Sequence, residues 1–150
     1  MNVYIKKSLT IFLILILIIP LSLLVVACEQ PDSGEKTITL VIGEGDNQKV
    51  FEALKTNGNY LVDALDELVW EGKLTYTSTD SLYGAYLTEI NGITPSNDNY
   101  IGILTTVSEQ QDITNWKVVK SYDNVDYVSA IYGISDLELI DGAKYMIALV

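Results

Sequence analysis

Few residues in this chain of 150 can carry out covalent or acid–base chemistry. It contains one cysteine, Cys28, and neither histidine nor arginine. Without histidine no Ser-His-Asp or Cys-His nucleophile can be assembled, and a single thiol forms neither a zinc cluster nor a disulfide. Paired carboxylates, lysines and tyrosines are the catalytic groups that remain. We therefore predict a protein that is not an enzyme and that has no catalytic residues, no bound metal and no cofactor.

The single cysteine has the surroundings of a lipid-modification site. Cys28 follows Ala27 at the end of an apolar run over residues 11–27, and Lys6 and Lys7 precede that run. A basic start, an apolar segment and a small residue before the cleavage site are typical of a secretory signal. We predict that residues 1–27 are a lipoprotein signal peptide and that Cys28 is the lipidation site. The two acyl chains of its diacylglyceryl group would bind a membrane far more firmly than one chain.

The same segment allows a second interpretation, an uncleaved anchor. About 17 to 20 apolar residues approach the length of a membrane-spanning helix. Pro20 in mid-segment and the polar stretch after Cys28 favour cleavage instead. In both interpretations Lys6 and Lys7 hold the N-terminus in the cytoplasm. We therefore expect a protein of the cell membrane, bound to it through the N-terminal lipid and facing the extracellular side.

Composition limits the partners of the remaining chain. Residues 28–35 are predicted to be the lipidated cysteine and a flexible polar tether, and residues 36–150 suffice for one domain. Seven lysines and all 20 acidic residues follow Cys28, which gives this part a net charge of −13. Such a charge opposes binding to phosphates, so we predict no nucleic-acid partner. The acids are spread along the chain, as on a solubilising surface; attraction of cationic ligands or metal ions is the alternative.

The first elements of the domain are well marked. Residues 36–42 alternate and are rich in β-branched side chains, which predicts a strand. The turn-forming residues 43–47 follow, and residues 49–55 are predicted to be the hairpin partner. Residues 60–71 place apolar side chains on one helical face and acids on the other, which predicts a helix with Asn59 as its N-cap and Gly72 at its end.

The rest of the domain shows short β-like runs separated by turn residues. The predicted strands span residues 74–76, 82–90, 100–107, 116–119, 127–132 and 145–150. The sum is an α+β fold, a mostly antiparallel β-sheet with one packed α-helix at about residues 60–71.

Several polar runs are candidates for a cation or catalytic site. The loops at 97–99 and 123–126 offer oxygen ligands, but neither has the central glycine and distal glutamate of a calcium loop. Asp63, Asp66 and Glu67 lie on the polar face of the predicted helix, where a solvated surface is a stronger interpretation than acid–base catalysis.

The aromatic residues are more suggestive of recognition. Tyr83 and Tyr86 flank Gly84, and Tyr100 and Trp116 follow. Tyrosine offers a large, rigid contact area with a polar tip, which suits an amphipathic ligand. Strands also favour tyrosine for ordinary packing, so packing remains the alternative for each of them.

The order of these elements resembles a known family. The chain is similar to bacterial surface domains related to the C-terminal β-domain of transcobalamin and intrinsic factor, the cobalamin carriers. Three stretches carry the resemblance: the helix start Tyr60-Leu61-Val62-Asp63-Ala64-Leu65, the strand and turn at residues 83–93, and the close Asp141-Gly142-Ala143-Lys144-Tyr145. It implies that residues 36–150 form one transcobalamin C-terminal-like α+β domain. In the carriers this domain supplies one side of the ligand pocket.

These observations lead to a functional expectation. We expect a lipid-anchored extracellular domain that binds a ligand or partner, as an accessory to the uptake of a corrinoid or other nutrient. The expected partners are that small ligand and a membrane transporter or surface protein. Tyr83, Tyr86, Tyr100 and Trp116 are the predicted contact residues. The alternative is a structural or adhesive cell-surface module with no small-molecule site.

Overall fold

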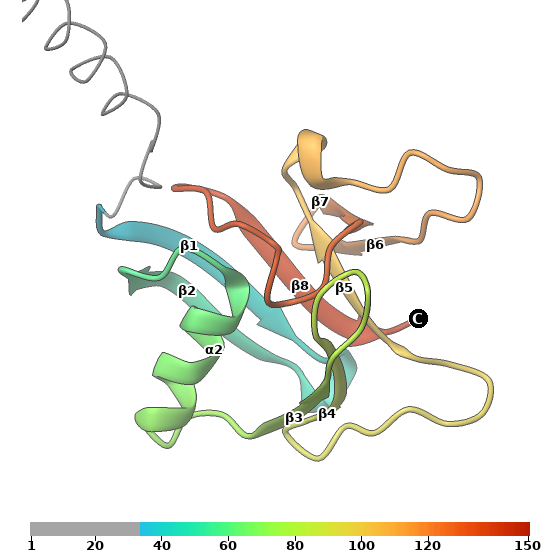
Figure 1. Cartoon of the computed structure of the whole chain (residues 1–150), viewed down its shortest axis with the longest axis horizontal. Coiled ribbons are helices and arrows are strands. Elements are labelled where there is room, and N and C mark those ends of the chain that lie inside the picture. Colours follow the sequence, from blue (N-terminus) through green and yellow to red (C-terminus); the bar gives the residue numbers. More distant parts are fainter. Residues whose placement is uncertain (1–33) are drawn as a thin grey trace, which may run out of the picture. The chain divides into compact units, whose positions relative to one another are not determined.

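The computed structural model describes residues 34–150. The predicted signal peptide, Cys28 and the start of the predicted tether lie outside these residues. A six-stranded sheet has the strand order β2-β1-β8-β5-β7-β6, and β3 and β4 form a separate two-stranded sheet (Figure 1). The elements are β1 Lys36–Ile42, β2 Lys49–Thr56, α2 Leu61–Trp70, β3 Tyr76–Thr79, β4 Tyr86–Ile90, β5 Ile101–Thr105, β6 Val119–Tyr122, β7 Val125–Ser129 and β8 Lys144–Leu149, with short 3-10 helices at Gly45–Asn47 (η1) and Ser108–Gln110 (η2). Within residues 34–150, no helix has the length and apolar character needed to cross a membrane.

The α+β class is confirmed, but the large sheet is mixed rather than antiparallel. β1 and β8, the first and last strands, pair in parallel at the centre of the sheet, and the other pairings of this sheet are antiparallel. The prediction failed here because turn signals report which consecutive strands form hairpins. Two strands separated by most of the domain leave no local signal of their direction.

The first hairpin formed as predicted. β1 and β2 pair antiparallel around η1, and the register shifts between Ile38 and Leu40. Opposite this shift Ala53 has φ = 49°, in the left-handed region, which is typical of a bulged strand.

The predicted helix is confirmed, with a different cap. Tyr60 occupies the N-cap position rather than Asn59. The Asp63 carboxylate accepts hydrogen bonds from the backbone N–H groups of Asn59 (2.8 Å) and Tyr60 (2.9 Å). The negative charge therefore lies at the positive end of the helix dipole. Gly72, with φ = 68°, follows the last turn as predicted.

The later strands are confirmed in number but shifted in position. β3 begins where the predicted strand 74–76 ends, and β6 begins where the predicted strand 116–119 ends. The positions of the two-residue turns were predicted correctly. Asn91 and Asn124 both adopt positive φ in tight hairpin turns.

The sheet is apolar on both faces at its centre. On one face Leu40, Tyr145 and Ile147 pack with the apolar stripe of α2, Leu61, Ala64, Leu65 and Leu68. On the other face Val41 and Met146 join a smaller cluster with Leu104, Tyr127 and Ala148. This arrangement follows from the two-residue period of a strand, which sends alternate side chains to opposite faces.

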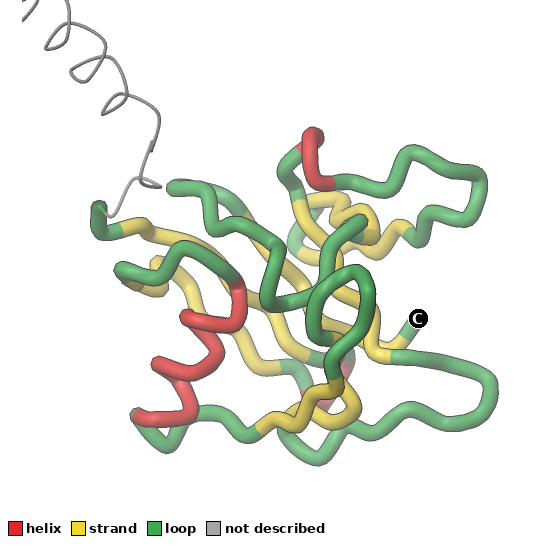
Figure 2. The backbone as a smooth tube through the Cα atoms, viewed as in Figure 1, coloured by secondary structure: helices red, strands yellow, loops and turns green. Residues whose placement is uncertain are grey.

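The connection from β7 to β8, residues 130–143, is a long loop next to α2 (Figure 2). Backbone hydrogen bonds hold it against the start of α2. The N–H of Leu61 donates to the carbonyl of Leu137, and the N–H of Leu139 donates to the carbonyl of Asn59. This connection supplies half of the residues around the candidate site.

Candidate functional site

An open pocket of about 570 Å³ lies where the β7–β8 connection meets η2 and the start of α2. We call it the Gln110 pocket, lined by Tyr60, Val107, Glu109, Gln110, Tyr132, Asp136, Glu138 and Ile140. Its volume is within the range of small-molecule sites. The lining comes from three separate stretches of sequence, so the pocket exists only in the folded chain.

Gln110 is the polar residue most enclosed by the structure at this site. The residue is 7% exposed, and its Nε2 donates to the backbone carbonyl of Glu138 at 2.9 Å. Its Oε1 is buried and has no hydrogen-bond partner within residues 34–150, and no other buried side-chain nitrogen or oxygen of these residues shares that state. This oxygen has less than 1 Å² of accessible surface, so it is not exposed to the pocket.

The backbone of residues 138–140, which accepts the Gln110 amide, is hydrogen-bonded to a buried side chain of the core. The Tyr145 hydroxyl donates to the same Glu138 carbonyl at 2.9 Å and accepts the N–H of Ile140, also at 2.9 Å. Burial raises the pKa of Tyr145 above its ordinary value. The backbone of residues 138–140 is therefore fixed from the sheet side.

The side chains around the opening are acidic and aromatic. Glu109, Asp136 and Glu138 contribute three exposed carboxylates, and no lysine is among the lining residues. Tyr60 and Tyr132 add two phenol rings. Acids beside aromatic rings favour cationic ligands, through charge and through cation–π attraction.

Two of the predicted contact residues lie near one another in the chain and beside this region. Tyr83 is 74% exposed in the turn before β4, and Tyr86, the first residue of β4, is half-exposed. The Tyr83 carbonyl accepts a hydrogen bond of 2.7 Å from the N–H of Gly133, the residue that follows Tyr132. The turn is thereby docked against the pocket-forming connection, although neither tyrosine lines the Gln110 pocket.

The other two predicted residues lie on different elements. Tyr100 precedes β5 and exchanges two backbone hydrogen bonds with Val150, near the end of β8. Trp116 is 88% exposed in the loop before β6. The two residues therefore belong to segments separate from the turn that holds Tyr83, and neither lines the Gln110 pocket.

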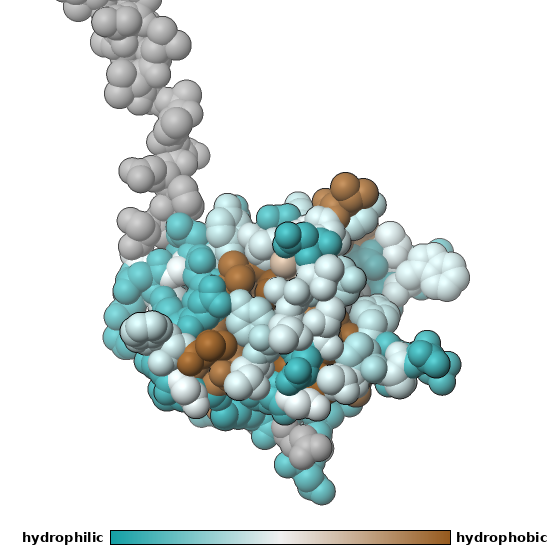
Figure 3. All heavy atoms as spheres, turned by 60° about the horizontal axis from the view of Figure 1, so that its bottom comes forward, coloured by the Kyte–Doolittle hydropathy of each residue, from teal (hydrophilic) through white to brown (hydrophobic). Residues whose placement is uncertain are grey.

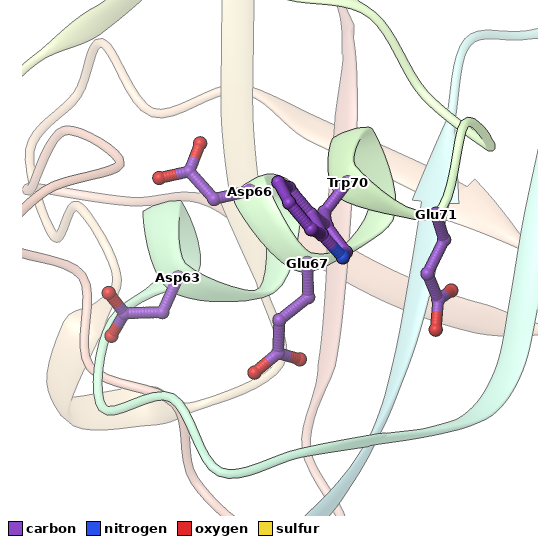
Figure 4. A pocket seen from close by; sticks show the side chains of 5 residues that line it. All are labelled: Asp63, Asp66, Glu67, Trp70 and Glu71. Carbon is purple, nitrogen blue, oxygen red and sulfur yellow. The ribbon is translucent and has the colours of Figure 1, made fainter.

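A second hollow, of about 500 Å³, lies on the outer face of α2. It is lined by Asp63, Asp66, Glu67, Trp70 and Glu71, and Asp66 points away from Asp63 and Glu67 (Figure 4). Asp63 serves the helix start, and Asp66 accepts the Tyr76 hydroxyl at 2.5 Å. The carboxylates do not converge on a point, so the arrangement suits a solvated face better than a metal or catalytic site.

The two polar loops at 97–99 and 123–126 make local hydrogen bonds. Asp126 accepts the Ser121 hydroxyl, and Asn99 accepts the N–H of Ser96. Among residues 34–150 no group of three or more Asp, Glu, Cys or His side chains is placed to hold a metal ion.

Sequence reasoning singled out neither Gln110 nor the acids that surround it. Gln110 stands in the polar run 108–111, which is typical of an exposed loop. Its burial depends on the β7–β8 connection closing over it, and no local pattern encodes that contact. Tyr132 is the last residue of the predicted strand 127–132 and was not among the predicted contact residues.

Exposed apolar side chains are scattered rather than joined. On the face shown in Figure 3 they form small separate groups. Leu82 (97% exposed), Ile113 (91%) and Trp116 (88%) stand out on loops of the described chain. Isolated exposed apolar residues are common on soluble surfaces.

Comparison with known proteins gives a distant structural likeness. No protein-family model matches the chain, and no curated protein matches it. A crystal structure of a "putative metal binding protein" from Ruminococcus gnavus is 18% identical, covers 77% of this chain and 97% of its own, and superposes with a TM-score of 0.49. A likeness of this strength carries no information about function.

Proposed function

We propose that this chain is a lipid-anchored binding protein of the extracellular cell surface, and that it holds a ligand or partner in the Gln110 pocket without catalysing a reaction. One observation carries the proposal of a binding site: a pocket of small-molecule size, assembled from three separate stretches of the chain, is lined by three acidic side chains and two phenol rings. Predicted lipidation at Cys28 carries the proposal of location.

The location has a direct test. Mass spectrometry of the membrane fraction should find Cys28 as the N-terminal residue, with a diacylglyceryl thioether. Cys28→Ala should leave the leader uncleaved. Finding the full-length protein in the cytosol with a free Cys28 thiol would contradict the proposed location.

The binding role is tested with the full chain in non-ionic detergent. A panel of small cations, neutral nutrients and corrinoids is titrated into the protein, and the heat of binding is measured. We expect at least one of these compounds to bind, and to bind more weakly to the Tyr132→Ala variant. Corrinoids belong in the panel because of the resemblance to cobalamin carriers, and they also allow detection by spectral shift. No heat from any of these compounds at millimolar concentration would contradict the binding role.

The exposed loop before β6 supports a second candidate, an adhesive surface module. Ile113 and Trp116 are both about nine-tenths exposed within four residues of sequence. Cells that display Ile113→Ser/Trp116→Ser should then adhere less, whereas Tyr132→Ala should adhere normally. The opposite pattern would favour the pocket.

A further inference from the structure

An asparagine followed by a glycine is prone to deamidation. The backbone nitrogen of the glycine can attack the side-chain amide of the asparagine, because glycine has no Cβ to obstruct the approach. The chain contains two such pairs, Asn57-Gly58 and Asn91-Gly92. The dipeptide is the same in both, so the contacts that each pair makes in the folded chain determine which one reacts.

The reaction makes three demands on the site. The glycine nitrogen must lose its proton, and a nearby carboxylate can accept it. The side-chain oxygen of the asparagine gains negative charge during the attack, and a hydrogen-bond donor aimed at this oxygen stabilises that charge. The backbone must also be able to rotate, so that the nitrogen reaches Cγ of the asparagine.

Asn91-Gly92 has both chemical contacts. The N–H of Gly92 donates to Oε1 of Glu89 at 3.3 Å, so the reacting nitrogen faces a carboxylate. Oδ1 of Asn91 accepts a hydrogen bond of 3.1 Å from the backbone N–H of Thr75. The N–H of Asn91 in turn donates to the carbonyl of Thr75 at 2.8 Å, which holds the asparagine beside that donor. One contact therefore lies at the nucleophile and the other at the oxygen that becomes negative.

The surroundings of this pair leave room for the rotation. Asn91 and Gly92 are both exposed at the tip of a two-residue turn, which is closed by backbone hydrogen bonds between Ile90 and Ile93. A Cβ at Gly92 would meet no atom within 4 Å beyond its chain neighbours. The turn can therefore change conformation without displacing any packed side chain.

Asn57-Gly58 is held in a different way. The N–H of Gly58 donates to Oγ1 of Thr56 at 2.9 Å, and a hydroxyl is a much weaker proton acceptor than a carboxylate. The carbonyl of Gly58 accepts the Lys36 ammonium at 3.0 Å, and a Cβ at Gly58 would overlap the Cβ of Asp63. The backbone of this pair is packed against the start of α2 and cannot rotate without displacing it.

We infer that Asn91 is a site of spontaneous deamidation in the folded protein, with Glu89 as the proton acceptor and the N–H of Thr75 as the donor to the reacting oxygen. The Gly92 nitrogen bonds to Cγ of Asn91, the Cγ–Nδ2 bond breaks, and the proton lost by Gly92 leaves with the amide as ammonia. The succinimide then takes up one water and opens to aspartate or isoaspartate. The turn gains a carboxylate and, in isoaspartate, one more main-chain carbon. This inference is independent of the proposed binding role.

The test follows both asparagines in the full chain, kept folded in non-ionic detergent at neutral pH for several weeks. Peptide mapping by mass spectrometry measures conversion at residues 57 and 91 in the same molecules, so Asn57 is an internal control. We expect Asn91 to convert about tenfold or more faster than Asn57. Isoaspartate should be among the products, because direct hydrolysis of the side chain gives aspartate alone. No conversion at Asn91, equal rates, or aspartate alone would overturn the inference.

Unfolding separates the effect of the fold from that of the sequence. In guanidinium chloride the contacts to Glu89 and Thr75 are lost, so we expect the two asparagines to convert at similar rates. A preference for Asn91 that persisted in the unfolded chain would assign it to neighbouring residues and overturn the structural account.

Glu89→Gln tests the proton acceptor, because glutamine has nearly the same size and cannot take up the proton. We expect conversion of Asn91 to slow about tenfold and that of Asn57 to stay unchanged. The matched control is Glu52→Gln, which makes the same change of charge at an exposed position of β2 and should leave both rates unaltered. An unchanged rate at Asn91 in Glu89→Gln, or an equal slowing in Glu52→Gln, would overturn the role of Glu89. The comparison of the two pairs in the unaltered protein does not depend on these variants.

Discussion

The Tyr145 hydroxyl, at the centre of the sheet, donates a hydrogen bond to the backbone carbonyl of Glu138, at the wall of the Gln110 pocket, over 2.9 Å. The same carbonyl accepts the Gln110 amide. One backbone oxygen therefore links the buried core to the candidate site. Because Tyr145 is fully buried, the position of this wall depends on the packing of β8.

Removing that hydroxyl should lower stability. Tyr145→Phe would leave the N–H of Ile140 without its partner and the Glu138 carbonyl with one donor instead of two. We expect a loss of about 1 to 3 kcal/mol in the free energy of unfolding, measured by urea denaturation. Tyr127→Phe is the matched control, because Tyr127 is also buried but its hydroxyl makes no hydrogen bond in the described chain. Equal losses in the two variants would contradict this account.

The start of α2 offers a second prediction. Asp63→Ala removes the acceptor for the N–H groups of Asn59 and Tyr60, so we expect a loss of about 1 kcal/mol in unfolding free energy. Glu67→Ala, on the same helix, should cost less, because no hydrogen bond of its carboxylate is present in the described chain. Thermal unfolding of the two variants measures the difference. A smaller effect for Asp63 than for Glu67 would show that the cap contributes little.

Two glycines should respond differently to alanine. A Cβ at Gly133 would lie 2.5 Å from the Ala85 carbonyl oxygen and 2.8 Å from the Gly84 carbonyl carbon, so Gly133→Ala must displace backbone. We expect Gly133→Ala to lower the free energy of unfolding by about 1 to 3 kcal/mol and to release the turn that holds Tyr83. Gly92→Ala meets no atom within 4 Å and should cost about 1 kcal/mol, from its positive φ alone. The N–H groups of residues 133 and 134 donate to the carbonyls of Tyr83 and Ala85, so their hydrogen exchange reports the release. Unchanged protection of these two N–H groups would refute the docking role.

High pH should destabilise the domain through its buried tyrosines. Burial raises the pKa of Tyr127 and of Tyr145 above the ordinary value of 10.0. The unfolded state therefore ionises first, so their contribution is complete below about pH 10 and is lost as the pH rises through the folded-state pKa values. Unfolding free energy measured across this range should fall with pH, and less steeply in Tyr127→Phe. A slope identical to that of the unaltered protein in this variant would argue against the buried phenol as its cause.

The local elements were predictable because their signals lie in adjacent residues. The first hairpin, α2 and the turns at Asn91 and Asn124 follow from alternation, helical periodicity and residues that accept positive φ. The helix cap was misassigned by one residue. Asn59 is a good N-cap residue, but in the folded chain Tyr60 takes that position and the Asp63 carboxylate accepts the N–H groups of both Asn59 and Tyr60.

Composition and contiguous residues were enough to predict the α+β class, the acidic character, the lack of histidine and arginine chemistry, and lipidation at Cys28. The parallel pairing of β1 with β8 and the assembly of the Gln110 pocket are apparent only in the folded chain. Both bring together residues far apart in the chain, and such contacts form through burial of the common core rather than through any local pattern.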